Sequence, residues 1–347
     1  MIRKTTRPTT ARCTLPMYMG FLISEPKSAT CTRLAEVTGI SHDSVNRFLE
    51  RESYEPIDLF KESTSELILN GGTLSVDDSV LDKPYSNYMA LVGHFWSGKH
   101  HRAVKGINLI TLYYTDPTGS HMPVNFRIYD KSEEKTKNDY FQDMMDEVLS
   151  WGLKPAFVTG DSWYSGVPNL KKVKNHQVGF MFAIESNRKI SLEKGDWRQV
   201  QSLHVPDNGL NVWLKDFGMV KLFRTFLKNQ KRHYIVYLPD KDMDSFLKDS
   251  FDQIHDYHWQ IEQYHRAIKQ VCHIEHFQVR NEKPIRNHIF SAIYSFVHLQ
   301  KMKASELIVN IYHHQRELYK DVVSAFIREF SEKKNCMSPQ FHDAVNE

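Results

Sequence analysis

The chain has 347 residues, 41% of them hydrophobic and 25% charged, so it can bury a sizeable core in two or three structural units. The formal net charge is only +3, so total charge does not indicate nucleic-acid binding, and any such surface must be local. No apolar run approaches the roughly 20 residues that span a bilayer, and no signal-peptide pattern is present. The four cysteines (Cys13, Cys31, Cys272, Cys336) show no paired spacing, so we expect a reduced, intracellular protein.

The first 13 residues are basic: Arg3, Lys4, Arg7 and Arg12 are accompanied by no acidic residue. Such an arm can follow DNA phosphates, and the alternative is a solvated terminus.

Residues 31–50 (CTRLAEVTGISHDSVNRFLE) predict a helix–turn–helix, in which Gly39 permits a left-handed turn between the helices. Ile40, Val45 and Phe48 are expected to bury the second helix, and Ser41 to cap it. The positions expected to be exposed are Ser41, His42, Asp43, Ser44, Asn46 and Arg47. In a DNA-reading protein these positions enter the major groove, with Asn46 and Arg47 as candidate contacts. The alternative is an ordinary pair of packed helices.

From residue 71 the pattern becomes rich in strands. Expected strands cover 72–80, 102–115, 123–129, 155–159 and 179–184, and expected helices cover 138–151 and 167–176. Three antiparallel strands followed by helical crossovers into parallel strands predict a mixed α/β sheet flanked by helices.

Two acidic residues are expected at the ends of neighbouring central strands: Asp78 after the first strand and Asp161 after PAFVTG. Ligand sites in open α/β sheets lie at the carboxyl ends of strands. A third carboxylate comes from a helix predicted over 254–277, where apolar residues recur at steps of three and four. A polar row flanks that apolar face and would hold Glu262 rigidly at the edge of the core; its members are His255, His258, Glu262, His265 and Lys269.

Three carboxylates brought together repel one another, and a divalent cation removes that conflict. Oxygen ligands suit Mg²⁺ or Mn²⁺, and two such ions about 3.5–4 Å apart support phosphodiester chemistry. For each acid alone, the alternative is a helix cap or a surface salt bridge. Zinc is not expected, because His258 and Cys272 would lie about 21 Å apart on a continuous helix.

With these residues in view, the chain resembles the DDE transposases of bacterial insertion sequences, in particular the insertion-sequence-four-like group. The matching segments are Asp78-Ser79, the run 158–164 (VTGDSWY), and Glu262 followed by Lys269. The signature of that group is Y-x2-R-x3-E-x6-K. Here His255 and His258 occupy the Tyr and Arg positions, with Tyr257 and Arg266 nearby.

The resemblance implies a ribonuclease-H-like mixed sheet over residues 69–300, interrupted by a β-rich insertion at about 186–240. An N-terminal helical region would cover 1–68 and a C-terminal helical tail 301–347. The catalytic and metal-binding set implied is Asp78, Asp161 and Glu262, with two Mg²⁺ (or Mn²⁺) ions. Asp77 stays open as the first ligand, although the resemblance places the acid immediately before a Ser or Thr and so favours Asp78.

The resemblance also implies a set of DNA contacts. Lys269 would hold a backbone phosphate, and Lys231 and Arg232 could grip phosphate or form a solvated turn. Trp213 would stack an extruded base or lie in the core. The remaining candidates for DNA contact are His258, Arg266, Arg47 and Asn46.

The function implied is Mg-dependent cleavage at element ends and strand transfer into target DNA. The partners would be double-stranded DNA carrying terminal inverted repeats, target DNA, and a second copy in a dimer. The expected location is cytoplasmic and nucleoid-associated. One alternative is a ribonuclease-H-like nuclease without strand transfer. The other is an inactive or domesticated DNA-binding protein, which the two histidine replacements would explain.

Overall fold

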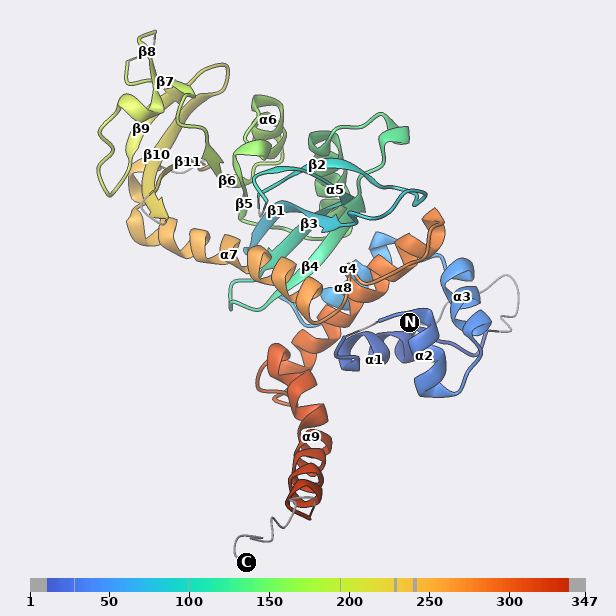
Figure 1. Ribbon diagram of the computed structural model, residues 1–347. Helices are drawn as coiled ribbons and strands as arrows, with labels where there is room; N and C mark the ends of the chain where they lie inside the picture. The colour runs from blue at the N-terminus through green and yellow to red at the C-terminus, as the bar shows by residue number, and fades with distance from the viewer. Residues whose placement is uncertain are drawn as a thin grey trace, which may run out of the picture.

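The computed structural model describes residues 11–27, 29–98, 100–193, 195–227, 230–239 and 242–336. Most of the basic arm therefore lies outside the described residues. In the described part of the chain, one large sheet has the strand order β2-β3-β1-β5-β6-β11-β10-β9-β7-β8, with β4 paired to β3 (Figure 1). None of the helices in that part has the length and apolar character needed to span a bilayer.

The strands are β1 (Thr73–Asp82), β2 (Gly93–Ser97), β3 (Arg102–Thr115), β4 (His121–Ile128), β5 (Phe157–Gly160), β6 (Gly179–Ile184), β7 (Lys189–Ser191), β8 (Trp197–Gln199), β9 (Leu210–Leu214), β10 (Gly218–Leu227) and β11 (Gln230–Tyr237). The helices are α1 (Leu15–Ser24), α2 (Cys31–Thr38), α3 (His42–Arg51), α4 (Pro56–Ser63), α5 (Lys137–Ser150), α6 (Val167–Asn175), α7 (Lys248–Gln270), α8 (Glu282–Ala304) and α9 (Ile311–Cys336).

The mixed sheet predicted from the sequence is confirmed. β1 pairs antiparallel with β3 and β3 antiparallel with β4, whereas β1, β5 and β6 run parallel to one another. Two expectations were wrong in detail. β2 was not expected, and β1 continues to Asp82, so Asp77 and Asp78 lie within the strand instead of ending it.

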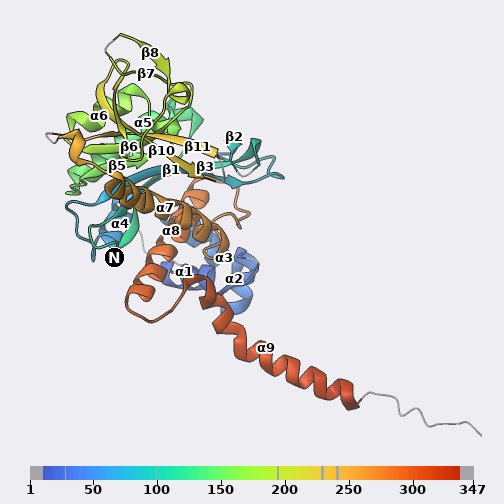
Figure 2. The ribbon, with the colours of Figure 1, turned by 90° about the vertical axis from the view of Figure 1, so that its left-hand side faces the viewer.

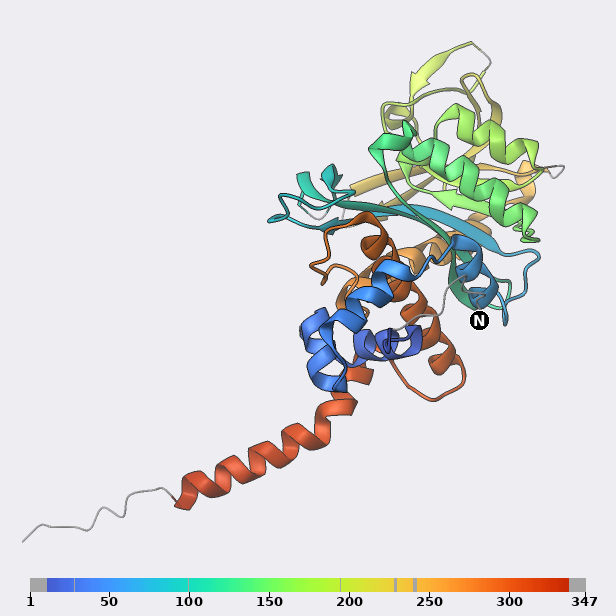
Figure 3. The ribbon, with the colours of Figure 1, turned by 90° about the vertical axis from the view of Figure 1, so that its right-hand side faces the viewer.

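The two faces of the sheet are covered by different helices (Figures 1 and 3). On one face α7 and α8 share a core with Leu81 of β1, and on the other α5 and α6 share a core with Leu74 and Val76. Because side chains alternate along a strand, odd-numbered β1 residues point to α7 and even-numbered residues point to α5. This alternation decides which acidic residue can meet Glu262.

The predicted helix–turn–helix forms from α2 and α3. Gly39 adopts the left-handed conformation (φ 68°) between them, and Ser41 Oγ caps α3 by accepting from Ser44 N (3.2 Å). The expectation that Ser44 is exposed was wrong. Its side chain is buried, and its hydroxyl accepts hydrogen bonds from Arg12 N and from Cys13 N (3.1 Å). Ser44 therefore joins the segment before α1 to α3.

The strands of the expected insertion extend the main sheet. β11 pairs antiparallel with β6, and β10 and β9 follow outward from it, so the sheet is continuous from β2 to β8 (Figures 1 and 2). This continuity brings β11 close to α7: Phe251 and Ile254 of α7 share a core with Tyr234 and Val236 of β11. The division of the chain into separate domains stays a prediction.

Helix α7 differs in extent from the expected 254–277. It begins at Lys248 and ends at Gln270, so Asp252 lies inside the helix and pairs with Lys248 instead of capping it. Helix α9 extends away from the rest of the molecule in all three views (Figures 1, 2 and 3). Several of its apolar side chains are exposed, among them Leu318, Val322, Val323 and Ile327.

Candidate metal centre

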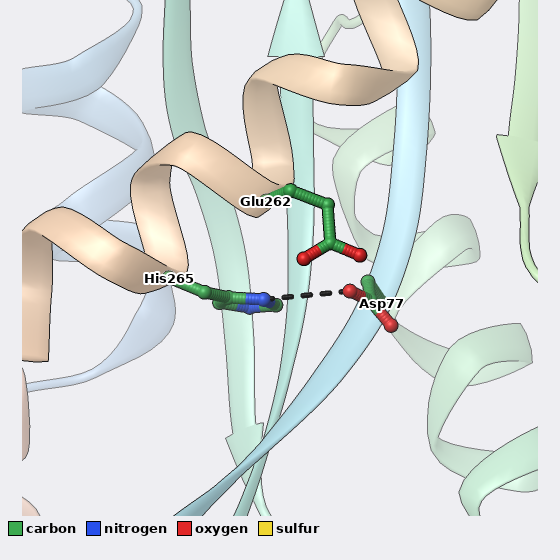
Figure 4. Close-up of side chains that lie close together, drawn as sticks. All are labelled: Asp77, Glu262 and His265. Atoms are coloured by element: carbon green, nitrogen blue, oxygen red, sulfur yellow. Dashed lines mark ion pairs between the residues drawn. The ribbon is translucent and has the colours of Figure 1, made fainter. Parts of the chain in front are cut away.

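Asp77, Glu262 and His265 form a compact cluster between the middle of β1 and α7 (Figure 4). Each residue offers one potential ligand atom, and these three atoms all lie within 4.8 Å of one another. Glu262 and His265 extend from α7 toward Asp77, and His265 Nδ1 is 3.4 Å from Asp77 Oδ2. Two carboxylates and one imidazole in such a space form a donor set that suits a divalent cation.

The carboxylate of Asp78 lies on the opposite face of the sheet. It accepts hydrogen bonds from Asn108 Nδ2 (2.6 Å), Lys137 Nζ (2.7 Å) and the Tyr164 hydroxyl (3.1 Å). These partners come from β3, from α5 and from the segment after β5, and together they occupy both carboxylate oxygens of Asp78. Strand alternation turns Asp77, and not the sequence-favoured Asp78, toward α7 and Glu262, so the geometry disagrees with the preference for Asp78. The identity of the metal ligand stays a prediction.

Asp161 directly follows β5, as expected, and β5 runs parallel to β1 with Gly160 opposite Val76. Its side chain accepts from Trp163 N (2.9 Å) and caps the short 3₁₀ turn Ser162–Tyr164. Burial, followed by repulsion from Asp77 and Asp78, raises the pKa of Asp161 to about 7. Asp161 is thus close enough to repel Asp77, although its oxygens are not among the compact cluster described above.

Glu262 is positioned by the amphipathic pattern of α7. Ile261, Tyr264 and Ile268 are buried against the sheet, which leaves the neighbouring Glu262 exposed at the edge of that contact. Desolvation and then repulsion from Asp77 raise the pKa of Glu262. Burial, followed by repulsion from Asp78, raises the pKa of Asp77 to about 7. The carboxylates are therefore held where ionisation of all of them is unfavourable without a bound cation.

His265 is a site residue that sequence reasoning placed in the polar row without assigning it a function. Its side chain is buried, and burial lowers its pKa to about 4, so the ring is neutral at neutral pH. The signal that could have found it is its spacing, because residues i and i+3 of a helix lie on one face and Glu262 is three residues before it.

Lys269 does not lie free beside the cluster. Its ammonium group donates to Val80 O (2.7 Å) and pairs with Glu275 (3.1 Å), so it links α7 to the end of β1. Arg266, also on α7, is exposed to solvent. A phosphate contact by either residue stays a prediction.

The two histidines at the signature positions are uncharged in this environment. Burial lowers the pKa of His258 to about 4, and His255 has a lowered pKa for the same reason. The His255 ring contacts Phe251 and Tyr234, with its Nε2 3.4 Å from the Tyr234 hydroxyl. Neither residue can therefore supply the permanent charge of an arginine.

Arg232 of β11 is near the cluster. Its charge acts to lower the pKa of Glu262 and also influences Tyr234 and His255. Lys231 and Arg232 are both exposed and lie in the strand β11, so the predicted alternative of a solvated turn is wrong and the phosphate contact stays a prediction. Because β11 joins the sheet next to β6, a strand that begins almost 150 residues after the end of β1 contributes charge to the site.

The other predicted DNA contacts lie away from the cluster. Trp213 is half-buried in β9. Asn46 is half-buried and hydrogen-bonded to His42 Nδ1 (3.1 Å), and Arg47 is exposed with its Nε donating to Asp43 O (3.2 Å). The geometry brings none of these three to the acidic cluster in the described part of the chain.

Residues 73–296 match the protein family described as the transposase DDE domain. The chain belongs to the DDE transposase family. The match includes β1 with Asp77, the segment after β5 with Asp161, and α7 with Glu262. The narrower bacterial insertion-sequence group expected from the signature is not confirmed by this match.

Among solved structures, this DDE transposase family member is similar to piggyBac transposase in its synaptic complex with hairpin DNA, with a TM-score of 0.51 and 16% identity. That alignment covers 98% of this chain and 77% of the other, and at this identity it shows the fold alone. The Drosophila P element transposase strand transfer complex aligns at a TM-score of 0.27 and 10% identity, over 49% of this chain and 38% of the other, which is too low to support an argument. No curated protein sequence matches the chain.

Proposed function

We propose that this protein is a DNA transposase that cleaves DNA at the ends of an element and joins those ends to target DNA. The observation that carries the proposal is the compact cluster of Asp77, Glu262 and His265 between β1 and α7, with Asp161 after β5 close enough to feel the charge of Asp77, all within the region matched by the family. The similarity in fold to piggyBac transposase, a protein described in complex with hairpin DNA, supports DNA as the substrate.

Asp77, Asp161 and Glu262 would hold Mg²⁺ or Mn²⁺, in two sites as the family resemblance implies. Bound cations would activate the attacking oxygen and stabilise the leaving oxygen of the phosphodiester. The raised pKa values of all three carboxylates fit this role, because a cation relieves the repulsion that otherwise favours protonation. Asp78, held by Lys137, would support β1 and α5 from the other face.

Arg232 is proposed to supply the positive charge that His258 cannot. It is exposed, permanently charged and electrostatically coupled to Glu262, so it can attract a DNA phosphate toward the carboxylates. Lys231, Arg266 and Lys269 remain secondary candidates, and Lys269 would first have to leave Glu275. Trp213, Asn46 and Arg47 would contact DNA away from the reacting phosphate.

A dimer is also proposed, since joining two ends requires two copies of the site. The exposed apolar side chains of α9 support this proposal, because an apolar row projecting into solvent is suited to packing against a second copy. The row is accompanied by side chains of both charges, such as Arg316, Glu317 and Lys320, which permits self-complementary pairing.

A direct test uses a linear DNA that carries both element ends, with Mg²⁺ or Mn²⁺ and the full-length protein. Wild type should release cleaved ends and then form strand-transfer products, whereas Asp161→Ala should do neither. Cleavage by Asp161→Ala at the wild-type rate would contradict the proposed active site.

A second candidate function is DNA binding without catalysis, favoured by the neutral His258 at a position where the signature has arginine. It predicts tight binding of element ends and no metal-dependent products from wild type in that assay. Cleavage without joined products would instead indicate a nuclease.

A further inference from the structure

We propose that His265 is itself a metal ligand of this site, which makes the site prefer a first-row divalent ion such as Mn²⁺ over Mg²⁺. This inference rests on the proposed function, because it concerns the same cation site between β1 and α7. It adds a nitrogen donor to a site that the sequence described with carboxylate oxygens alone.

The position of the ring supports a ligand role. His265, Glu262 and Asp77 each offer one potential ligand atom within 4.8 Å of the others, which is the spacing of donors around one ion (Figure 4). Asp161 lies outside this compact group, with its Oδ1 accepting from Trp163 N. His265 is thus the third donor of the compact group, and it comes from the same helix as Glu262.

The distance between His265 and Asp77 argues against a simple hydrogen-bonding role. Nδ1 is 3.4 Å from Asp77 Oδ2, whereas an N–H···O bond is usually about 2.7–3.2 Å long. A histidine that only oriented Asp77 would be expected to make the shorter contact.

The surroundings of the ring hold it in one orientation. The His265 residue is only 6% exposed, and its Nε2 is a buried atom with no hydrogen-bond partner among the described residues. The ring packs against Tyr264, with the two ring centroids 5.3 Å apart. An imidazole held in one orientation is pre-organised to bind a metal ion through its free nitrogen.

A nitrogen donor changes which ion is favoured. Mg²⁺ takes oxygen ligands almost exclusively, whereas first-row divalent ions accept imidazole together with carboxylates. A site in which an imidazole joins the carboxylates therefore binds Mn²⁺ more tightly relative to Mg²⁺ than carboxylates alone would.

The decisive experiment is pulsed electron paramagnetic resonance on full-length protein loaded with Mn²⁺, with ¹⁵N-labelled histidine. The expected result is a nitrogen coupling typical of a directly bound imidazole in wild type and in His204→Asn, a control at an exposed histidine distant in sequence. The coupling should be absent in His265→Phe, which retains a ring for packing, and circular dichroism would verify its fold.

Titration calorimetry adds a second readout. His265→Phe should weaken Mn²⁺ binding about tenfold or more while changing Mg²⁺ binding less, since loss of even an outer-shell partner costs about 10–100-fold in metal affinity. His265→Asn, which keeps a polar group, serves if the phenylalanine variant does not fold.

Three outcomes would overturn the inference. In the first, wild type binds Mn²⁺ without a nitrogen coupling, and Asp77→Asn loses that binding. This result would reject His265 as a ligand and leave the proposed function standing. A coupling that persists in His265→Phe would assign it to another histidine. Failure of wild type to bind Mn²⁺ at all would reject both the ligand and the proposed metal site.

Discussion

Asp77 and Asp78 are adjacent in β1, and their carboxylates lie on opposite faces of the sheet. Asp77 Oδ2 is 3.4 Å from His265 Nδ1 on α7, and Asp78 Oδ2 is 2.7 Å from Lys137 Nζ at the start of α5. One residue therefore faces the helix that carries Glu262, and the other ties the strand to the opposite helical layer. The two acids should respond differently to the same substitution.

Asp77→Asn should abolish Mn²⁺ binding and lower DNA cleavage about a hundredfold or more, because cation stabilisation contributes several kcal/mol in such sites. Asp78→Asn should retain metal binding and lose stability, because it leaves Lys137 without its charged partner in a mostly buried position. Calorimetry with Mn²⁺, a cleavage assay and thermal unfolding would measure these effects. The opposite pattern of metal binding would restore Asp78 as the ligand.

The contribution of Asp77 and Asp161 to the stability of the metal-free protein should decrease as pH rises between about 4 and 7. The pKa values of Asp77 and Asp161 are raised from 3.8 to about 7 in the folded state, so in that window the folded chain holds protons that the unfolded chain has released. The stabilising contribution is present below the unfolded pKa and is lost as pH rises through the folded pKa.

The measurement is the free energy of unfolding in a chelator, compared between wild type and the double variant Asp77→Asn, Asp161→Asn. The comparison removes the contribution of buried histidines such as His258, whose lowered pKa acts in the opposite direction. The free energy of unfolding of wild type minus that of the variant should decrease from pH 4 to 7. In the presence of Mn²⁺ instead of chelator, wild type should be stabilised more at pH 8 than at pH 5. A difference that does not change with pH would refute the raised pKa values.

Ser44→Ala should destabilise the protein by about 1–3 kcal/mol, because its buried hydroxyl accepts from Arg12 N and Cys13 N and its loss leaves backbone donors unsatisfied. The matched control is Ser41→Ala, which removes the cap of α3 and should cost about 1 kcal/mol. Chemical denaturation would measure both. Equal stability of wild type and Ser44→Ala would show that these hydrogen bonds contribute nothing.

Arg232→Gln should weaken DNA binding and reduce the slope of log affinity against log salt concentration by about one, as expected for the loss of one phosphate contact. The control is Arg316→Gln, an exposed arginine on α9, which extends away from the sheet. Fluorescence anisotropy at several salt concentrations would give both slopes. An unchanged slope for Arg232→Gln would exclude a phosphate contact by this residue.

Val322→Glu should shift the protein from dimer to monomer without changing its fold, because it places a charge in the exposed apolar row of α9, where Val322 is 66% exposed. Light scattering coupled to size-exclusion chromatography, with and without DNA, would measure the mass. Glu317→Gln, on the same helix and outside that row, is the control. A wild-type protein that is monomeric in both conditions would reject the proposed dimer.

The sequence by itself determined the order and type of most elements around the site. The apolar runs that became β3 and β6 have the predicted bounds, and the helical spacing that became α5 and α6 agrees to within a residue, because these patterns are local. The placement of Asp161 after a short apolar strand, and of Glu262 beside the buried face of α7, followed from the same local rules.

Only the tertiary structure decided which acids meet. A single strand pattern does not say which of its two faces will be covered by α7, so Asp77 and Asp78 were equivalent until β1 was seen between the two helical layers. The charge of Arg232 reaches Glu262 because β11 pairs with β6 across the sequence, a non-local contact that no local pattern encodes. His265 became a candidate ligand for the same reason: its helical spacing was visible, but the carboxylate opposite it belongs to a strand almost 190 residues earlier.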